Sequence, residues 1–456
     1  MQRNGHNGNS NHNNHSSSHR HSYNASLSAK RNTALTAAIT SARGSKSELE
    51  IIIKAEYGRR DEVARQLERI GKVEHVYSFV PYLSLRCDAD YADILRKASS
   101  GNVSDSVFEK TFRSIIPAIS AIDVSSNFSI PKTKPGARTH TAKSSLWNLD
   151  AIGAYDAQGY GTGEDVKIAI IDTGIDYNHS QLRDRFGSEK GYDFVKNDND
   201  PMDQNGHGTH VAGTVASIDY GIAIGCRLYA VRGLDQDGSG SEAGAIAGIE
   251  WCIKNNIDVA NMSFGGPIAS QAFEDVCSYA RQQGVLLVAA AGNSGYGASY
   301  PAAFGDSVIA VAAVDQELSH PEFSNIYETN DISAPGVDVV STYIGERYAT
   351  LSGTSMASPH VTGSLGLAKS IASGLADDLE AIMKSKAQNL GDAEIFGAGL
   401  LKVDLMAKFL SGESRYARNG QPMSLVKDYM AFEKTADAAL SRFAKDALTE
   451  VRRIFS

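Results

Sequence analysis

The sequence predicts an α/β protein whose main sheet is mostly parallel. Two mostly apolar runs, Val166–Ile171 and Leu286–Ala291, end abruptly, the first at Asp172 and the second at Gly292 and Asn293. Runs of this kind are typical of strands that are buried on both faces of a parallel sheet. Helices are predicted after two glycine-containing turns, at 205–208 and 353–355. With 456 residues, 42% of them hydrophobic, the chain is long enough for more than one domain.

The first predicted strand ends at Asp172. Further along the chain, a glycine-containing turn places His207 between two glycines. In open α/β sheets the carboxyl ends of the strands are where chemistry gathers, although a carboxylate at this place also caps turns. The glycines let the backbone approach His207 closely, which suits a catalytic imidazole. His210 falls inside the predicted helix, and we expect it to be structural.

The second apolar run leads to Asn293, whose amide can donate to an oxygen that becomes negative during acyl transfer. Ser355 lies in Gly353-Thr354-Ser355-Met356-Ala357-Ser358-Pro359-His360, at a tight turn where a helix begins. A hydroxyl there can face a substrate and is helped by the positive end of the helix. Alone, each residue is a common turn residue; together they supply a nucleophile, a base and an oxyanion donor.

These four segments resemble those of the subtilisin-like serine proteases, which carry aspartate, histidine and serine in this order. The resemblance covers about residues 145–411 and implies a three-layer domain with a mainly parallel central sheet. It implies a serine endopeptidase with Ser355 as the nucleophile and His207 as the base. Asp172 would orient His207, and Asn293 would stabilise the oxyanion. The alternative is a catalytically silent, protease-like protein that only binds peptides.

The resemblance also implies two backbone-rich segments between which an extended peptide substrate lies. The expected substrate-binding residues are Gly238, Ser239 and Gly240 in one segment, Ser263, Phe264 and Gly265 in the other, and Ala290, Ala291 and Gly292 in the pocket wall. None of these side chains is charged, so we expect a preference for apolar or medium-sized side chains. Glu242 falls where relatives carry a residue that lines a more distant pocket and would favour a basic residue there, but the sequence favours a solvated surface glutamate over this role.

The chain divides into five predicted segments. Residues 1–47 are rich in Asn, Ser and His and contain no acidic residue, so we expect disorder. Residues 48–130 have the pattern of a small α+β domain of β-α-β-β-α-β, ferredoxin-like type. Its place before the protease resembles the propeptide that helps folding and then blocks the cleft; an ordinary accessory domain is the alternative. Residues 131–144 form a linker, 145–411 the catalytic domain and 412–456 a helical extension. We expect self-cleavage between about residues 128 and 145.

The chemistry is expected to need no cofactor. A structural calcium ion is a further expectation at Asp331, with the carbonyl groups of Ala302 and Phe304, at positions that relatives use. The tighter calcium site of that family is doubtful here, because the loop after the histidine segment is short and Gln181 stands where a carboxylate ligand is expected.

Composition restricts the partners. A net charge of −9 and a pI near 5.8 argue against nucleic acid. No apolar run reaches the roughly 18 to 20 residues needed to span a membrane. The resemblance implies protein or peptide substrates and the chain's own propeptide as partners.

The sequence does not decide between an intracellular and an exported protein. The chain has four scattered cysteines, expected to be buried free thiols, and its first residues lack the apolar core of a secretory signal. These features favour a reducing interior, whereas a propeptide favours export.

Overall fold

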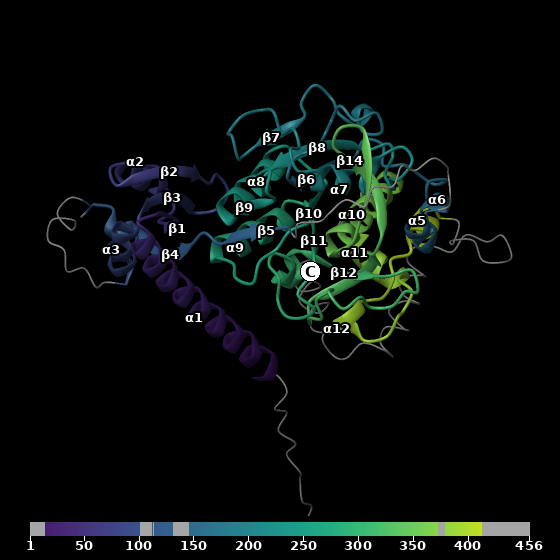
Figure 1. Ribbon diagram of the computed structural model, residues 1–456. Helices are drawn as coiled ribbons and strands as arrows, with labels where there is room; N and C mark the ends of the chain where they lie inside the picture. The colour runs from purple at the N-terminus through teal and green to yellow at the C-terminus, as the bar shows by residue number, and fades with distance from the viewer. Residues whose placement is uncertain (1–13, 101–111, 113, 131–145, 373–378, 413–456) are drawn as a thin grey trace, which may run out of the picture.

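The computed structural model describes residues 14–100, 112, 114–130, 146–372 and 379–412. The predicted linker at 131–144 and nearly all of the predicted extension at 412–456 lie outside these residues. Figure 1 shows a large domain beside a small N-terminal domain, with the long helix α1 (Asn14–Ser45) packed at one end against the small domain and extending away from it.

The large domain is built on a seven-stranded sheet in the order β13-β12-β11-β10-β6-β8-β7, with every neighbouring pair parallel. Its strands are β6 (Lys167–Asp172), β7 (Gly191–Asp193), β8 (Arg227–Arg232), β10 (Val259–Met262), β11 (Leu286–Ala290), β12 (Ile309–Val314) and β13 (Asn330–Pro335). The α/β fold with a parallel central sheet is thus confirmed. Both apolar runs of the sequence are strands of its interior.

Helices cover both faces of this sheet. Along β6, Ile168 and Ile170 belong to one apolar cluster with α7 (His207–Ala216) and α10 (Thr354–Ile371). Ala169 and Ile171 belong to a second cluster with α8 (Glu242–Lys254) and α9 (Gln271–Gln282). Because side chains alternate across a strand, this division shows three layers, helix, sheet and helix.

Shorter elements complete the large domain. They are α5 (Trp147–Ile152), α6 (Ala154–Ala157), β9 (Ser239–Ser241), the hairpin β14 (Val339–Tyr343) and β15 (Arg347–Leu351), α11 (Leu379–Lys386), α12 (Ala393–Phe396) and α13 (Val403–Ser411). Among the described residues, 3-10 helices lie at Arg183–Arg185 and Ala302–Ser307 of the large domain and at Ile116–Ala118 of the small one.

The small domain has the predicted arrangement of elements. Its antiparallel sheet has the order β2-β3-β1-β4, and two helices pack on one face. The elements are β1 (Glu48–Ala55), α2 (Arg60–Leu67), β2 (Gly71–Val76), β3 (Tyr82–Asp88), α3 (Ala89–Ser99) and β4 (Ile119–Val124). One detail differs from the expected strand pair near 118–128: β5 (Asn127–Ser129) leaves this sheet and pairs with β9 of the large domain.

The open face of the small sheet packs on α8 and α9. The buried Tyr77 donates its hydroxyl to the Ala243 carbonyl oxygen, at 3.1 Å. Glu250 of α8 accepts 2.6 Å hydrogen bonds from the backbone N–H groups of Ser78 and Phe79. The small domain therefore shares a buried interface with the large one.

The N-terminal segment contradicts the expectation of disorder for residues 1–47. Residues 14–45 form α1, whose Leu35 and Ile39 are buried in the core of the small domain and whose Ala42 is buried on the same face. These three positions repeat at intervals of four and three, so they form one apolar stripe on a helix. The polar composition of the whole segment obscures this short stripe. Residues 1–13 lie outside the described part.

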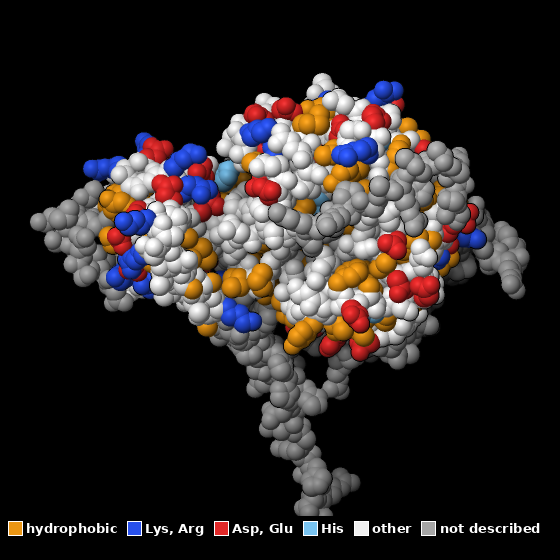
Figure 2. All heavy atoms as spheres, viewed as in Figure 1, with side chains coloured by type: hydrophobic (Ala, Val, Ile, Leu, Met, Phe, Trp, Pro, Cys, Tyr) orange, Lys and Arg blue, Asp and Glu red, His pale blue; other side chains and the backbone are white. Residues whose placement is uncertain are grey.

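Several surface and composition features can be stated for the described residues. None of their helices is both long and apolar enough to cross a membrane. In the view of Figure 2, acidic and basic side chains are mixed over the small domain. The four cysteines, Cys87, Cys226, Cys252 and Cys277, are free and buried, as expected, and burial raises the pKa of Cys226 to about 12.

Candidate active site

Asp172 and His207 meet at the carboxyl edge of the sheet. Asp172 is the last residue of β6 and is fully buried, and His207 is the first residue of α7. The His207 Nδ1 atom lies 2.8 Å from Asp172 Oδ1 and 3.0 Å from Oδ2. Because a carboxylate only accepts, Nδ1 carries the proton, and Nε2 is left as the basic nitrogen.

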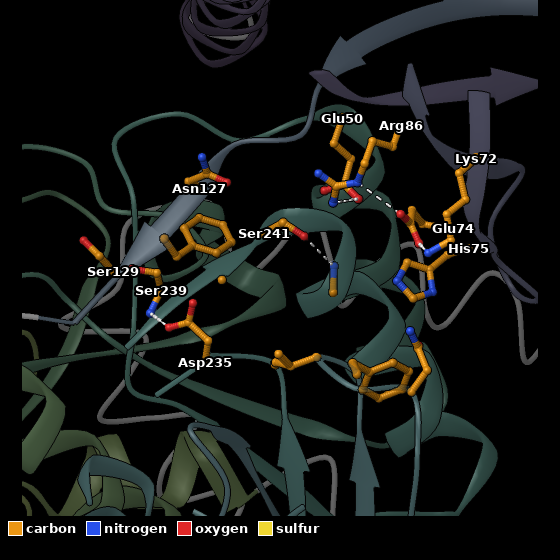
Figure 3. Close-up of a pocket in the computed structure, with 17 residues that line it drawn as sticks. Glu50, Lys72, Glu74, His75, Arg86, Asn127, Ser129, Asp235, Ser239 and Ser241 are labelled. Carbon is orange, nitrogen blue, oxygen red and sulfur yellow. Dashed lines mark hydrogen bonds and ion pairs between the residues drawn. The ribbon is translucent and has the colours of Figure 1, made fainter. Parts of the chain in front are cut away.

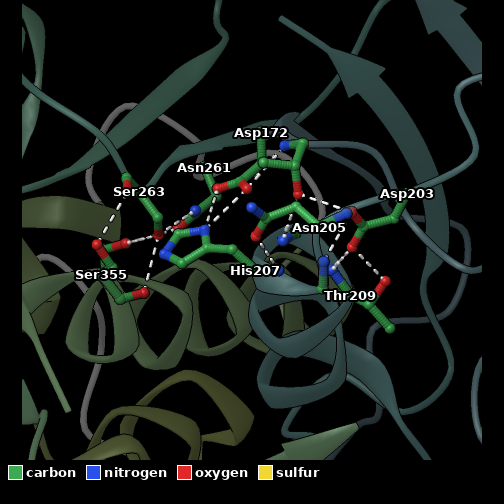
Figure 4. A network of polar contacts seen from close by, with 12 residues as sticks. Asp172, Asp203, Asn205, His207, Thr209, Asn261, Ser263 and Ser355 are labelled. Atoms are coloured by element: carbon green, nitrogen blue, oxygen red, sulfur yellow. Dashed lines mark hydrogen bonds and ion pairs between the residues drawn. The ribbon is translucent and has the colours of Figure 1, made fainter. Parts of the chain in front are cut away.

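Ser355 is the second residue of α10, where it joins the same region. Its hydroxyl donates to the Ser263 carbonyl oxygen at 2.9 Å, and the Ser263 hydroxyl donates to the Ser355 carbonyl oxygen at the same distance. Figure 4 shows the His207 ring between the Asp172 carboxylate and the Ser263 and Ser355 side chains. The serine is thus held at the start of a helix, against the segment 263–265 that is predicted to bind substrate.

Asn293 is fixed by the residue next to Ser355. Its Oδ1 atom accepts hydrogen bonds of 2.9 Å from both the backbone N–H and the hydroxyl of Thr354. Because the amide oxygen is used in this way, the amide nitrogen is the group left to donate. A Cβ atom at Gly353 would lie 3.3 Å from that nitrogen, so glycine keeps the space beside it open.

His210 lies in a separate environment from His207. It is fully buried, and its Nε2 lies 3.1 Å from the Val339 carbonyl oxygen and 3.2 Å from that of Ala349. Burial lowers the pKa of His210 to about 3, so the ring is neutral. These contacts join α7 to the hairpin β14–β15 and agree with the structural role expected for this histidine.

Asp203 is a residue of the site that the sequence analysis missed. Its Oδ1 accepts from the Thr173 hydroxyl at 2.9 Å and from the N–H groups of Asn205 and Gly206. Its Oδ2 accepts from the N–H and hydroxyl groups of Thr209, at 3.0 and 2.6 Å. Asp203 therefore ties the segment after Asp172 to the turn that carries His207. An acid four residues before the histidine was the available signal.

Asn261 plays a corresponding part on the other side. It is fully buried on β10 and donates from Nδ2 to the Ser263 hydroxyl at 2.8 Å. Its Oδ1 accepts from the hydroxyl groups of Ser358 and Thr362, each at 2.9 Å. This amide fixes the first turns of α10 relative to the predicted substrate-binding segment at Ser263. Nothing in the local sequence distinguishes it from an ordinary strand residue.

The predicted segment 238–240 carries a bound strand from the small domain. Residues 127–129 of β5 pair antiparallel with 239–241 of β9, and the Ile130 N–H donates to the Gly238 carbonyl oxygen at 2.9 Å. Gly238 has a φ of +74°, and a Cβ atom there would lie 2.2 Å from Ile130 Cγ1. Glycine is therefore needed both for the backbone conformation and for the approach of the strand.

The side chain of Phe128 enters an apolar pocket next to the second predicted segment. Its ring centroid lies 5.3 Å from that of Phe264 and 5.6 Å from that of Phe273, and the side chain is 1% exposed. Gly265 has no room for a side chain, because a Cβ atom would lie 2.3 Å from Ser299 Oγ. The bound strand thus contacts both predicted substrate-binding segments.

The predicted pocket wall lies at the end of β11. Ala290 and Ala291 are buried, and Gly292 has a φ of +109° that directs the chain to Asn293. A Cβ atom at Gly292 would lie 2.6 Å from Asn325 Nδ2. The wall is therefore formed by small, uncharged residues, as the sequence indicates.

Glu242 is not the solvated surface glutamate that the sequence favours. It is fully buried beneath the small domain, and its carboxylate accepts from the N–H groups of Ser126 and Ser270, at 3.3 and 2.7 Å. Burial raises the pKa of Glu242 to about 7. The sequence could not show this, because Ser126 belongs to the other domain.

A cavity of about 540 Å³ separates the bound strand from the small sheet. Figure 3 shows it lined by Glu50, Glu74 and Arg86 on one side and by the bound strand and β9 on the other. Arg86 Nε lies 3.1 Å from Glu74 Oε1, and Lys72 Nζ lies 2.6 Å from Glu74 Oε2. The small domain therefore touches the large one in separate patches.

The expected cation position at Asp331 has a different neighbour. Asp331 Oδ1 lies 2.6 Å from the Lys384 ammonium, and Oδ2 accepts from the Ala310 N–H at 2.8 Å. Lys384 thus supplies positive charge where calcium was expected. At the tighter site, the Gln181 amide exchanges two hydrogen bonds with Asp219. The described residues contain no cluster of three or more His, Cys, Asp or Glu side chains suited to a metal ion.

Comparison with known proteins gives the class of this protein. Residues 163–399 match the model of the subtilase family, and the chain belongs to that family. It is therefore a serine-type endopeptidase, whose substrates are proteins.

Individual relatives agree with this class. The chain is 44% identical over 263 residues to subtilisin DY from Bacillus licheniformis, covering 55% of this chain and 94% of that protein. It is 41% identical over 271 residues to subtilisin Savinase from Lederbergia lenta, covering 58% and 98%. It is 40% identical over 293 residues to a thermostable alkaline protease from Halalkalibacterium halodurans, covering 62% and 76%.

Proposed function

We propose that Ser355, His207 and Asp172 form the catalytic triad of this endopeptidase and that the chain is a zymogen that processes itself. The observation that supports the triad most directly is the pair of contacts between His207 Nδ1 and the buried Asp172 carboxylate. A buried carboxylate held on the far side of an imidazole fixes the tautomer whose Nε2 accepts a proton.

The mechanism follows from the positions of these groups. As the Ser355 oxygen attacks the peptide carbonyl carbon, His207 Nε2 takes the hydroxyl proton and then gives it to the leaving amine. Asp172 stabilises the imidazolium during this step. The Asn293 amide nitrogen donates to the carbonyl oxygen as it becomes negative. Water then hydrolyses the acyl-enzyme by the same route, so the reaction requires no cofactor.

The small domain acts as an intramolecular inhibitor in this proposal. Its strand β5 and Ile130 extend along β9 as a peptide substrate would, and Phe128 fills the apolar pocket beside Phe264. Full burial of such a side chain stabilises the complex by about 2 kcal/mol. We place the processing bond after Ile130 and within the predicted range to residue 145, because residues up to Ile130 occupy the upstream positions.

The same contacts suggest the preference of the enzyme. The bound strand places an aromatic side chain in a pocket formed by Phe264 and Phe273, and the wall formed by Ala290 and Ala291 is uncharged. We propose that substrates with apolar side chains at these positions are cleaved fastest. A library of peptides that varies these positions would measure the preference directly.

Labelling with a fluorophosphonate separates catalysis from the alternative of a peptide-binding protein. After removal of the small domain, the wild-type chain should be labelled at one serine, and Ser355→Ala should not be labelled. Ser352→Ala, which changes an exposed serine nearby, is the matched control and should be labelled normally. A wild-type chain that stays unlabelled would favour the silent, peptide-binding alternative.

Maturation is tested separately by following chain length. Ser355→Ala should accumulate as the full-length precursor, whereas the wild type should give a new N-terminus after Ile130. N-terminal sequencing of the mature protein locates the bond. If the purified Ser355→Ala protein showed the same new N-terminus, another protease would be responsible for processing.

A further inference from the structure

Helix α1 precedes the elements of the expected propeptide, and one of its side chains reaches across to the large domain. Arg31 is 8% exposed although it lies on a polar helix. Its Nε donates to the Ala269 carbonyl oxygen and its Nη1 to the Gln271 side-chain oxygen, both at 2.7 Å. Its Nη2 lies 3.3 Å from Glu274 Oε2. All three acceptors lie at or just before the first turns of α9.

The rest of α1 is anchored to the small domain. Leu35 and Ile39 continue the face on which Arg31 lies and are buried in the core of the small domain, and Ala42 is buried on the same face. At the far end, Arg43 lies 2.6 Å from Asp90 Oδ1 and 2.9 Å from Asp93 Oδ2 on α3. Movement of the small domain away from α9 would therefore draw Arg31 out of its contacts.

The acceptor site on α9 is shaped for a cation. A carbonyl oxygen, an amide oxygen and a carboxylate oxygen converge on one planar guanidinium, which suits its fixed set of donors. Gln271 is held in place by its own bond from Nε2 to Asp275 Oδ1, at 2.9 Å. The neighbouring Asp123 of the small domain accepts from the Gln271 N–H at 3.3 Å. The acceptor site at the start of α9 is therefore held in place beside the main interface between the two domains.

We propose that the start of α9 is an additional docking surface for the small domain and that Arg31 of α1 is its ligand. The small domain then holds the protease through residues 126–130 in the substrate cleft, through its sheet on α8 and α9, and through Arg31 at the start of α9. This inference rests on the proposed inhibitory function of the small domain. After the linker is cut, each contact keeps the others at high local concentration, so the inhibitor leaves slowly.

The experiment uses the full chain with Ser355→Ala, which prevents self-processing. A recognition sequence for a site-specific protease is placed within 131–144, the linker is cut, and the dissociation rate of the small domain is measured by fluorescence. Arg31→Ala should increase this rate about tenfold, as expected for loss of hydrogen bonds from a charged group. Lys30→Ala removes an adjacent, exposed positive charge and should leave the rate unchanged within about twofold.

Gln271→Ala tests the same contact from the large domain without altering α1. It should also increase the dissociation rate, and combining it with Arg31→Ala should add less than the two single effects predict. If both single variants dissociate at the rate of Lys30→Ala, the additional docking surface does not exist. The proposed inhibition is tested by a different measurement. If the small domain does not inhibit, an active precursor whose linker is uncut should hydrolyse a peptide substrate at the rate of the mature enzyme.

Discussion

The faces of the two sheets of this protein are covered in different ways. The seven-stranded sheet is covered on both faces by helices of its own domain, with α7 and α10 on one side and α8 and α9 on the other. The four-stranded sheet covers one face with its own helices and places the other on α8 and α9. The first arrangement buries the sheet within one domain, whereas the second buries the open face of the small sheet only through its contact with the large domain.

The contacts differ in kind as well. Within the large domain, the site is held by side-chain networks in which Asp203 and Asn261 each join several segments. Between the domains, many contacts are made with backbone groups, such as the two N–H groups that Glu250 binds. Changes in the networks should therefore affect the rate of catalysis, and changes at the interface should affect release of the small domain.

The largest effect is expected for Asn293→Ala. Loss of the amide donor should lower kcat about 10²–10³-fold with little change in KM, a range measured for one such donor in subtilisin. Steady-state kinetics of the mature enzyme give both constants. The dissociation rate of the small domain should stay unchanged, and a fall of less than fivefold in kcat would show that Asn293 does not face the oxyanion.

A smaller loss is expected for Asp203→Asn, which keeps the size of the side chain. In this variant an amide NH2 group replaces one acceptor oxygen and faces hydrogen-bond donors. Each buried donor that is left unsatisfied costs about 1–3 kcal/mol. We expect kcat to fall about tenfold or more at constant KM, and the free energy of unfolding in urea to fall by a similar cost.

The pH profile distinguishes positioning from plain destabilisation in this variant. If Asp203 positions His207, the variant should change both the maximal kcat and the pH at which kcat falls on the acidic side. A variant that loses stability but keeps the wild-type kcat and pH profile would mean that Asp203 serves the fold alone.

Glu250→Gln tests the interface. Glutamine keeps one acceptor for the two N–H groups at Ser78 and Phe79, so the small domain should dissociate about tenfold faster from the cut Ser355→Ala precursor. Glu189→Gln changes an exposed glutamate and serves as the control. Activity of the mature enzyme should be the same in all three proteins; a loss of activity in Glu250→Gln would contradict the separation of the two kinds of contact.

The smallest effect is expected from the titration of Glu242. Its pKa is raised from 4.5 to about 7, so between these pH values the folded precursor keeps a proton that the unfolded chain has lost. The free energy of unfolding should therefore fall as pH rises from about 4.5 to 7, by at most about 1.4 kcal/mol per pH unit from this group. Denaturant unfolding of Ser355→Ala at several pH values measures this slope.

Glu242→Gln removes this titration and should flatten the slope by the contribution of one group. Equal slopes in Glu242→Gln and its parent would show that Glu242 is ionised in the folded precursor throughout this range.

The sequence predicted the parallel sheet and the small α+β domain because both depend on local patterns. The runs at 168–171 and 286–291 are apolar because both faces of their strands are buried. The pairing of Asp172 with His207 was expected from motifs around each residue, and the structure brings them within 3.0 Å.

What the sequence did not reveal depends on residues that are far apart in the chain. Lys384 lies beside Asp331 only in the folded chain. Glu242 is covered by the small domain, whose Ser126 N–H donates to its carboxylate. The α1 stripe has three apolar residues in a segment whose average composition is polar, so composition concealed it. Asn261 acts through hydroxyl groups about a hundred residues away in sequence.

If the small domain inhibits the enzyme as proposed, Gly238 has a consequence for any attempt to relieve that inhibition by mutation. The space that its missing side chain leaves is filled by Ile130 of the small domain. A bulkier residue that expelled Ile130 would obstruct a peptide strand entering along the same edge. Resistance and activity are therefore coupled at this position, and an uninhibited yet efficient variant has to arise from changes outside the groove.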